Sequence, residues 1–226
     1  MENKIAFIIC TNDKLYCNEC LYYISKLEKP DDYDIETILI EDAEYMTKAY
    51  NEAMNKSDAK YKVYLHQDTF IINKNFIYDI LNIFEDKNIG MVGMIGVEKM
   101  PEADKFIDQI QDKGLWTAGR VYAKNVQKTM EFCYGKKAES LVSVQAVDGM
   151  LMVTQYDVPW REDIFCGWDF YDISQSMEFL KNNYKIVVPD FEKPWVLHDH
   201  GILNYENYLH WKDVFFKEYN EYILSL

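Results

Sequence analysis

The feature that most constrains the fold of this chain is the alternation of strand-like and helix-like segments over residues 1–97. Short β-branched and aromatic runs predict buried strands, and each is followed by apolar residues at helical spacing. We expect strands over residues 4–10, 33–40, 61–68 and 90–97, and helices over residues 14–29, 45–56 and 75–84. Strands that alternate with helices in this way pair in parallel through right-handed crossovers, so the sequence predicts an α/β fold.

The second half of the chain is less regular. Residues 98–119 show no clear periodicity and predict a long loop. Beyond them we expect strands over residues 141–147, 150–154 and 185–188, the last ended by Pro189, and helices over residues 168–181 and 205–224. The final helix carries a stripe of aromatic residues. That stripe predicts packing on its own domain or, as the alternative, a homodimer contact.

Composition excludes several classes of protein. The net charge is −14, and Arg120 and Arg161 are the only arginines. This balance argues against a nucleic-acid partner, because such binding relies on Lys and Arg to neutralise phosphates. A phosphorylated ligand would need a divalent cation held by carboxylates. No apolar stretch approaches the ~20 residues of a transmembrane helix. Five cysteines without a signal peptide predict reduced thiols and a cytoplasmic protein.

The third predicted strand ends in the polar triplet His66-Gln67-Asp68. Side chains alternate faces along a strand, so His66 and Asp68 point the same way and Gln67 points away. Open α/β sheets bind their ligands where strands end, and both His and Asp are metal ligands. The alternative interpretation is an ordinary strand-end turn with a solvated Asp68.

Two acids lie at the start of the helix expected over residues 168–181. Asp169 and Asp172 are three residues apart, which would put them on one helical face. Either acid can simply stabilise the helix N-terminus. Asp169 can also act as a general base that takes the proton of an acceptor hydroxyl. Neighbouring aromatic residues, Trp168 and Tyr171 among them, can exclude water or stack on a sugar ring.

A pair of histidines follows the last predicted strand. His198 and His200 share a face if the backbone is extended, which favours metal ligation. The alternative is two ordinary surface or core histidines. His with carboxylate suits Mn²⁺ or a similar cation, whereas an all-oxygen ligand set favours Mg²⁺. The sequence leaves both metals open.

The order of these motifs resembles that of family 2 glycosyltransferases with the GT-A fold, in particular the streptomycin-biosynthesis-type subgroup. The resemblance covers residues 4–201 and rests on Glu41-Asp42, Tyr50-Asn51-Glu52-Ala53, His66-Gln67-Asp68, Val147-Asp148-Gly149, the segment of Asp169 and His198. It implies a mixed, mostly parallel central sheet flanked by helices, in a single domain over residues 1–201. Residues 1–97 would bind the nucleotide and residues 98–201 the acceptor, with a C-terminal helix within residues 202–226.

The resemblance also implies roles for individual residues. Asp169 would be the catalytic base, and Asp68 and His198 would hold Mn²⁺ or Mg²⁺. The donor would be bound by Thr11, Asn12, Glu41, Asn51, His66, Gln67, Asp148 and Gly149, with His200, Asp172, Trp168 and Trp116 as further candidates. The chain departs from the family pattern at His66, where an Asp is usual, and at Trp168, which replaces the first acid of a Glu-Asp pair.

Together these features predict an inverting, metal-dependent glycosyltransferase. Its donor would be a nucleoside-diphosphate sugar, with a UDP-sugar favoured, and its acceptor a hydroxyl of a carbohydrate or another molecule. One base is enough for a single in-line displacement, so the paired carboxylates of glycoside hydrolases are not expected. Two alternatives stay open. One is a non-catalytic nucleotide- or sugar-binding module on the same fold, and the other is a metal-dependent hydrolase.

Overall fold

A computed structural model describes residues 1–124, 127–135, 140–201 and 206–226 of the protein. The helices are α1 (Lys14–Ile24), α2 (Met46–Lys56), α3 (Phe76–Ile83), α4 (Phe106–Lys113), α5 (Tyr171–Lys181) and α6 (Tyr208–Ser225). The strands are β1 (Lys4–Thr11), β2 (Asp34–Glu41), β3 (Tyr61–His66), β4 (Thr69–Ile71), β5 (Ile89–Gly93), β6 (Ile95–Val97), β7 (Ala118–Lys124), β8 (Thr129–Tyr134), β9 (Ser140–Val144), β10 (Ala146–Val147), β11 (Leu151–Thr154), β12 (Lys185–Asp190) and β13 (Val196–His198).

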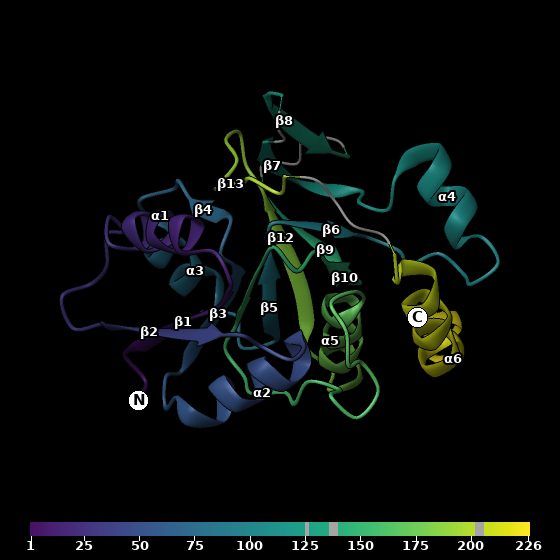
Figure 1. Ribbon diagram of the computed structural model, residues 1–226, viewed down its shortest axis with the longest axis horizontal. Coiled ribbons are helices and arrows are strands. Elements are labelled where there is room, and N and C mark those ends of the chain that lie inside the picture. The colour runs from purple at the N-terminus through teal and green to yellow at the C-terminus, as the bar shows by residue number, and fades with distance from the viewer. Residues whose placement is uncertain (125–126, 136–139, 202–205) are drawn as a thin grey trace.

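The larger of two sheets is mixed and lies at the centre of the molecule (Figure 1). Its strand order is β2-β1-β3-β11-β5-β12-β9. β1 pairs in parallel with β2 and β3, and β12 pairs in parallel with β5. β11 inserts antiparallel between β3 and β5, and β9 pairs antiparallel with β12. The alternating N-terminal segments therefore form parallel strands, as predicted, and the second half of the chain adds the antiparallel ones.

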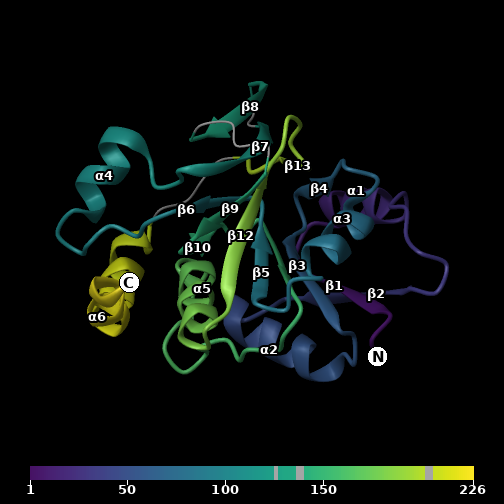
Figure 2. The same ribbon diagram turned by 180° about the vertical axis from the view of Figure 1, so that it is seen from behind.

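The side chains of β1 show how helices cover both faces of this sheet. Ile5, Phe7 and Ile9 pack into one core with residues of α1 and α3. Ala6 and Ile8 pack into a second core with residues of α2 and α5. All five side chains are fully buried. Successive residues of a strand face opposite ways, so this one strand requires helices on both sides of the sheet. Figure 2 shows the two helical layers from behind.

The smaller sheet corrects two predictions. Its order is β10-β6-β7-β13-β4, with β8 paired to β7. The strand expected over residues 90–97 is divided, because β5 belongs to the larger sheet and β6 to the smaller. The strand expected over residues 141–147 divides in the same way into β9 and β10. Gly96 permits the close approach of β6 to β10, since a Cβ added at Gly96 would lie 2.7 Å from the carbonyl oxygen of Ala146.

A helix occupies part of the region predicted as a long loop. Residues 98–119 contain α4 and the start of β7. α4 has only eight residues, and a helix this short is marginal without tertiary packing. Its Phe106 is fully buried against Phe216 of α6 and Phe170, at ring distances of 5.1 and 5.8 Å. These partners come from distant parts of the chain, so local periodicity did not show the helix.

Two element ends also differ from prediction. α1 ends at Ile24 rather than near residue 29. Ser25 is its C-cap, and the Ser25 hydroxyl donates a hydrogen bond to the carbonyl of Tyr22. β12 continues through Pro189, which was expected to end it. Beyond Val187 this strand pairs only with β9, and proline is tolerated where one side of a strand is unpaired.

The C-terminal helix α6 packs on its own domain. Four of its apolar side chains are buried in a core shared with α4 and α5: Phe215, Phe216, Tyr219 and Ile223. The predicted first residue of this helix, Tyr205, lies outside the described residues. The homodimer contact stays a prediction. None of the described helices is both long and apolar enough to cross a membrane.

Candidate active site

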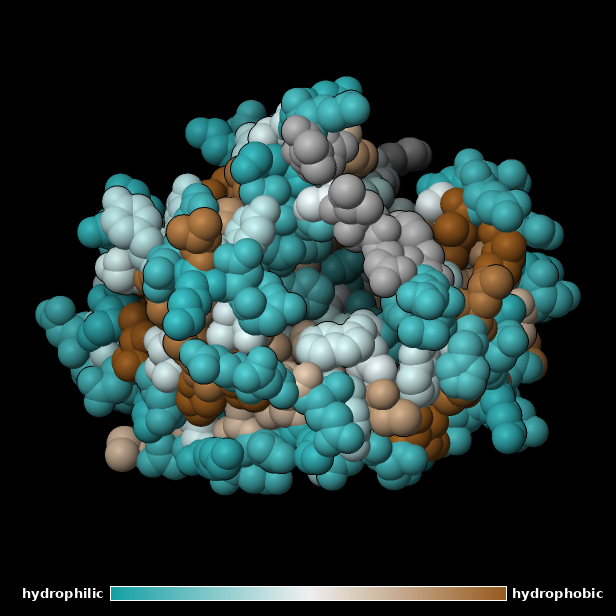
Figure 3. Space-filling view, viewed as in Figure 1, coloured by the Kyte–Doolittle hydropathy of each residue, from teal (hydrophilic) through white to brown (hydrophobic). Residues whose placement is uncertain are grey.

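A pocket of about 400 Å³ opens where β1 and β3 end, and we call it the first pocket. It is lined by Cys10, Thr11, Asn12, Asp42, Ala43, Met46, His66, Gln67, Asp68 and Trp168. Parallel pairing of β1 with β2 and β3 brings these strand ends to one edge of the sheet, where α/β proteins bind ligands. Figure 3 shows a hollow lined mostly by hydrophilic residues near the middle of this face of the molecule.

Three candidate metal ligands meet at the rim of the first pocket. His66 ends β3, Asp68 lies in the turn before β4, and His198 ends β13, which pairs antiparallel with β4. One ligand atom from each lies within 4.8 Å of the others. Nε2 of His198 is 3.4 Å from Oδ1 of Asp68. The structure therefore brings together both predicted metal ligands and adds His66 to them.

Electrostatics in this group keep Asp68 ionised and His66 neutral, while contact with Asp68 outweighs burial and raises the pKa of His198. Burial opposes ionisation of Asp68, but its contact with His198 and the nearness of His66 outweigh burial and hold its pKa below the usual value. Burial lowers the pKa of His66, which favours the neutral ring that binds metals. The buried Oδ1 of Asp68 has no hydrogen-bond partner among the described residues. A buried, unsatisfied carboxylate oxygen beside two imidazoles fits a cation such as Mn²⁺.

Tyr171 contacts this group, although the sequence assigned it only to the aromatic surroundings. Its buried hydroxyl lies 2.5 Å from Nε2 of His66. Gly149 packs against the same hydroxyl, and an added Cβ there would lie 2.1 Å from it. A hydrogen bond of this kind fixes the orientation of a metal-binding histidine. Sequence reasoning missed this contact, because the direction of the Tyr171 side chain depends on where α5 begins.

Asp148 and Asp172 hold the turn that contains Gly149. Asp172 accepts a hydrogen bond of 2.8 Å from the N–H of Gly149, and Asp148 accepts one of 2.8 Å from the N–H of Met150. Burial and the neighbouring Asp148 carboxylate raise the pKa of Asp172 to about 7. Asp172 lines neither the first pocket nor the one described next. Its carboxylate accepts hydrogen bonds from the main-chain N–H groups of Gly149 and Ile173.

Asp169 lines a second pocket of about 720 Å³. This second pocket shares Asp68 and Trp168 with the first. Its other lining residues are Cys166, Gly167, Glu206, Asn207, His210 and Trp211. Burial raises the pKa of Asp169, which makes its carboxylate a stronger base. The four lining residues from the start of α6 and just before it had no predicted role in a site.

Asp169 and Asp172 do not share a helical face, contrary to prediction. α5 begins at Tyr171, after Phe170 in the left-handed conformation with φ of 61°. A left-handed residue other than glycine is uncommon and needs support from its surroundings. The buried Phe170 ring packs 5.5 Å from that of Phe215 in α6. Because the backbone changes direction at Phe170, Asp169 lines the second pocket, whereas Asp172 binds the N–H of Gly149.

Gln67 lies in the turn after β3 and binds the loop after β1. Its Oε1 accepts hydrogen bonds from Thr11 Oγ1 at 2.8 Å and from the N–H of Asn12 at 3.0 Å. Its Nε2 donates to Oδ1 of Asn12 at 2.6 Å. All three residues line the first pocket, and Gln67 fixes the shape of that loop. Their roles toward a donor stay predictions.

Three predicted site residues lie beside the pockets or apart from them. Glu41 is exposed at the end of β2, and its neighbour Asp42 lines the first pocket instead. Trp116 lines a separate depression. The ring of His200 is 5.6 Å from that of His198, outside the three-residue ligand group. The buried Nδ1 of His200 has no hydrogen-bond partner in the part of the chain that the structure describes.

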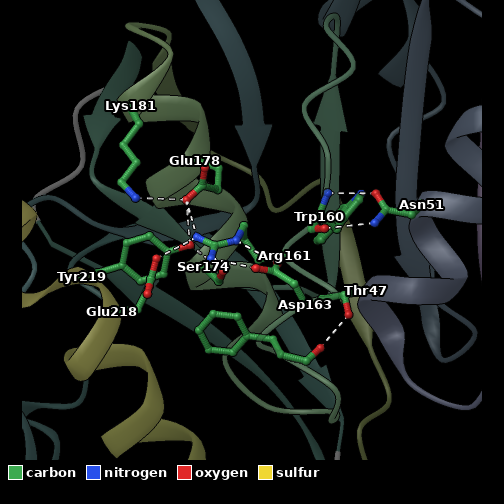
Figure 4. A network of polar contacts seen from close by, with 11 residues as sticks. Thr47, Asn51, Trp160, Arg161, Asp163, Ser174, Glu178, Lys181, Glu218 and Tyr219 are labelled. Carbon is green, nitrogen blue, oxygen red and sulfur yellow. Dashed lines mark hydrogen bonds and ion pairs between the residues drawn. The ribbon is translucent and has the colours of Figure 1, made fainter.

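Asn51, predicted to bind the donor, is bound to the main chain of the loop before α5 (Figure 4). Its Nδ2 donates to the carbonyl of Trp160 at 2.9 Å, and the N–H of Trp160 donates to its Oδ1 at 2.9 Å. Arg161, the next residue of this loop, donates a hydrogen bond from its guanidinium to the carboxylate of Glu218 in α6, at 2.8 Å. These contacts fasten the loop to α2 and α6, and Asn51 lines neither pocket.

We expect the substitution Asn51→Ala to destabilise the protein by about 1–3 kcal/mol, because the N–H of Trp160 loses its partner and the Trp160 carbonyl keeps only its hydrogen bond from the N–H of Glu162. Asn55→Ala is the matched control, since Asn55 is exposed one turn later on the same helix. Urea unfolding followed by circular dichroism measures both variants. Equal stability of the two would contradict a fastening role for Asn51.

Comparison with known proteins agrees with this architecture. Residues 6–219 match the family described as "Glycosyltransferase like family". A comparison with curated protein sequences found no match. The chain is similar in structure to S. aureus TarS 1–349, with a TM-score of 0.53 and 12% identity over 87% of this chain and 60% of that chain.

Two solved complexes are similar to the same degree. For S. aureus TarS 1–349 with UDP-GlcNAc, the TM-score is 0.54 and the identity 11%, over 89% of this chain and 59% of that chain. For the mannosyltransferase PcManGT from Pyrobaculum calidifontis with GDP-Man and Mn²⁺, the values are 0.55 and 14%, over 93% and 60%. The chain thus spans about 60% of the length of these proteins.

These solved structures are GT-A glycosyltransferases, so the GT-A fold expected from the sequence is confirmed. The family match extends over residues 6–219, which is nearly the whole chain. The protein therefore belongs to the glycosyltransferase-like family.

Proposed function

We propose that this protein is an inverting, metal-dependent glycosyltransferase acting on a nucleoside-diphosphate sugar. The observation that carries the proposal is the junction of two pockets at Asp68 and Trp168. Candidate metal ligands lie on one side of the junction, and the half-buried carboxylate of Asp169 lies on the other. A donor in the first pocket and an acceptor in the second would meet there.

The charge of the first pocket supports a donor bound through a cation. Among its described lining residues there is no Lys or Arg, while Asp42 and Asp68 are acidic. A diphosphate would be repelled by these acids unless a cation lay between them. His66, Asp68 and His198 would hold that cation, which when bound would offset charge developing on the leaving diphosphate. The Mn²⁺ and UDP-GlcNAc in the solved neighbours support Mn²⁺ and a UDP-sugar.

The proposed chemistry at the acceptor side needs one base. Asp169 takes the proton of the acceptor hydroxyl while its oxygen bonds to the anomeric carbon of the donor. The bond from that carbon to the diphosphate oxygen breaks in the same displacement, and the configuration inverts. The raised pKa of Asp169 strengthens it as a proton acceptor. Trp168, which lines both pockets, helps to exclude water from the junction.

One observation favours a second candidate, a binding module without turnover. His66 stands where the family carries an acid, and its Nε2 is engaged by the Tyr171 hydroxyl. Such a module would bind nucleoside diphosphates but would not consume a donor. From the order of the motifs, we also propose membership of the streptomycin-biosynthesis-type subgroup, and from the five free cysteines a cytoplasmic location.

A panel of nucleoside diphosphates tests the proposal. We expect UDP with Mn²⁺ to raise the melting temperature most, and a chelator to abolish the shift. Ligand at a hundredfold excess over Kd stabilises the folded state by about 2.7 kcal/mol, which is large enough to detect. Differential scanning fluorimetry gives the shift, and release of UDP from UDP-sugars separates the enzyme from the binding module. If no nucleoside diphosphate changes the melting temperature, the proposed donor site is wrong.

A further inference from the structure

The wall of the second pocket is built partly by the C-terminal helix. Trp211 of α6 packs against Gly167, where an added Cβ would be 2.5 Å from Cε2 and Nε1 of the indole. Its ring is 6.3 Å from that of Phe165 in the same loop. Gly167 directly precedes Trp168 and Asp169 in the chain. The helix and the loop that carries the proposed base therefore form one packed unit.

The indole of Trp168 also lines the second pocket, and it is exposed to solvent. Trp168 is 55% exposed, the highest exposed fraction among the tryptophans. It borders both pockets, next to Asp169. Sugars present C–H faces that pack on aromatic rings, and indole offers the largest such surface at little cost in conformational entropy. Two indoles lining one pocket, one of them open to solvent, fit a ring-shaped acceptor.

The charge of the second pocket narrows the class of acceptor. Asp68 belongs to the metal-ligand group, so the negative charge left to the pocket comes from Asp169 and Glu206. Among its described lining residues, His210 is the one side chain that can become cationic. A phosphate or carboxylate entering this pocket would lose hydration and face two like charges, whereas a hydroxyl or an ammonium group would not.

We propose that the second pocket selects a neutral or amine-bearing sugar as the acceptor and discriminates against anionic sugars. Trp168 and Trp211 provide the apolar surface, and Glu206, Asn207 and His210 provide polar contacts for hydroxyl or amino groups. The start of α6 and the two residues before it, Glu206 and Asn207, are thereby the specificity-determining element. This inference rests on the proposed function, because it takes Asp169 to face the acceptor.

Three disaccharides of similar size and different charge test this proposal. N,N'-diacetylchitobiose is neutral, its deacetylated form carries two amines, and digalacturonic acid carries two carboxylates. Each is titrated into the full chain with Mn²⁺ and UDP present, and binding is followed by tryptophan fluorescence and calorimetry. We expect the diacid to bind at least about tenfold more weakly than the other two. Equal or tighter binding of the diacid would overturn the proposal.

Two substitutions separate the contribution of aromatic packing to sugar binding from the contribution of charge. Trp168→Ala should weaken binding of the neutral sugar about tenfold, and the protein should stay folded because the Trp168 side chain is exposed. Glu206→Gln should weaken the diamine more than the neutral sugar. Tyr22→Ala, which removes a side chain that is 60% exposed on α1, is the control. If neither Trp168→Ala nor Glu206→Gln changes any affinity, the sugars do not bind where we propose.

The two proposals can fail separately. A UDP-dependent thermal shift with no sugar binding would overturn the acceptor assignment and leave the donor site standing. The absence of any nucleotide shift would overturn the proposed function, and the acceptor assignment with it.

Discussion

The substitution Asp169→Asn is expected to abolish sugar transfer while binding of the nucleoside diphosphate survives. An amide cannot take up the proton of the acceptor hydroxyl, and a positioned general base typically contributes about 10²–10⁴-fold to rate. Asp169 lines the second pocket only, so its change should leave the first pocket intact. The expected result is therefore a loss in kcat of that order, with an unchanged thermal shift by UDP and Mn²⁺.

Release of UDP from a donor in the presence of an acceptor measures this loss. Glu162→Gln is the control, because Glu162 is an exposed acid of the same loop and lines neither pocket. Full transfer by the Asp169→Asn protein would show that another group is the base. A lost thermal shift would instead assign Asp169 to donor binding.

The substitution Asp68→Asn should have the second largest effect. Asp68 lies between His66 and His198, and it is the one anionic member of that ligand group. An amide keeps the shape but loses the charge and is a poorer ligand. We expect loss of the chelator-sensitive thermal shift and a fall in turnover of roughly 10²–10³-fold, as when a charge-stabilising group is removed from other active sites.

Mn²⁺ titrations with and without UDP test this expectation for Asp68→Asn. Asp79→Asn is the matched control, because Asp79 is also half-buried and lines neither pocket. An Asp68→Asn protein that still binds UDP in a metal-dependent way would rule out Asp68 as a ligand. In that case His66 and His198 would need another acid, and the adjacent Asp148 would be the next to test.

The edge of the sheet where we propose that the donor binds was predictable, because it depends on strands that the sequence displays; of the residues predicted to bind the donor, Thr11, Asn12, His66 and Gln67 line the first pocket. Alternating apolar and helical segments predicted parallel strands, and the ends of parallel strands share an edge. The period of two along β3 predicted that His66 and Asp68 would point the same way, with Gln67 opposite. The structure brings His66 and Asp68 together, although β3 ends at His66 and Asp68 lies in the turn that follows, and Gln67 binds the loop of Thr11 and Asn12.

The acceptor side was not predictable, because it depends on contacts between distant segments. Helical spacing suggested a shared face for Asp169 and Asp172, yet a left-handed residue at Phe170 separates them. That conformation is supported by packing against α6, about 45 residues later in the chain. Asn51 resembled a donor-binding residue by its motif, but its amide binds the main chain of Trp160.

The sequence by itself determined the α/β class and the edge of the sheet where the polar strand ends gather, while the family resemblance implied Asp68 and His198 as candidate ligands. It could do so because side-chain periodicity within one strand or helix is a local property. Only the tertiary structure decided that β13 pairs with β4, which brings His198 to Asp68, and that α6 closes the second pocket over Gly167. Those contacts join segments far apart in the chain, and their geometry depends on packing that local periodicity does not encode.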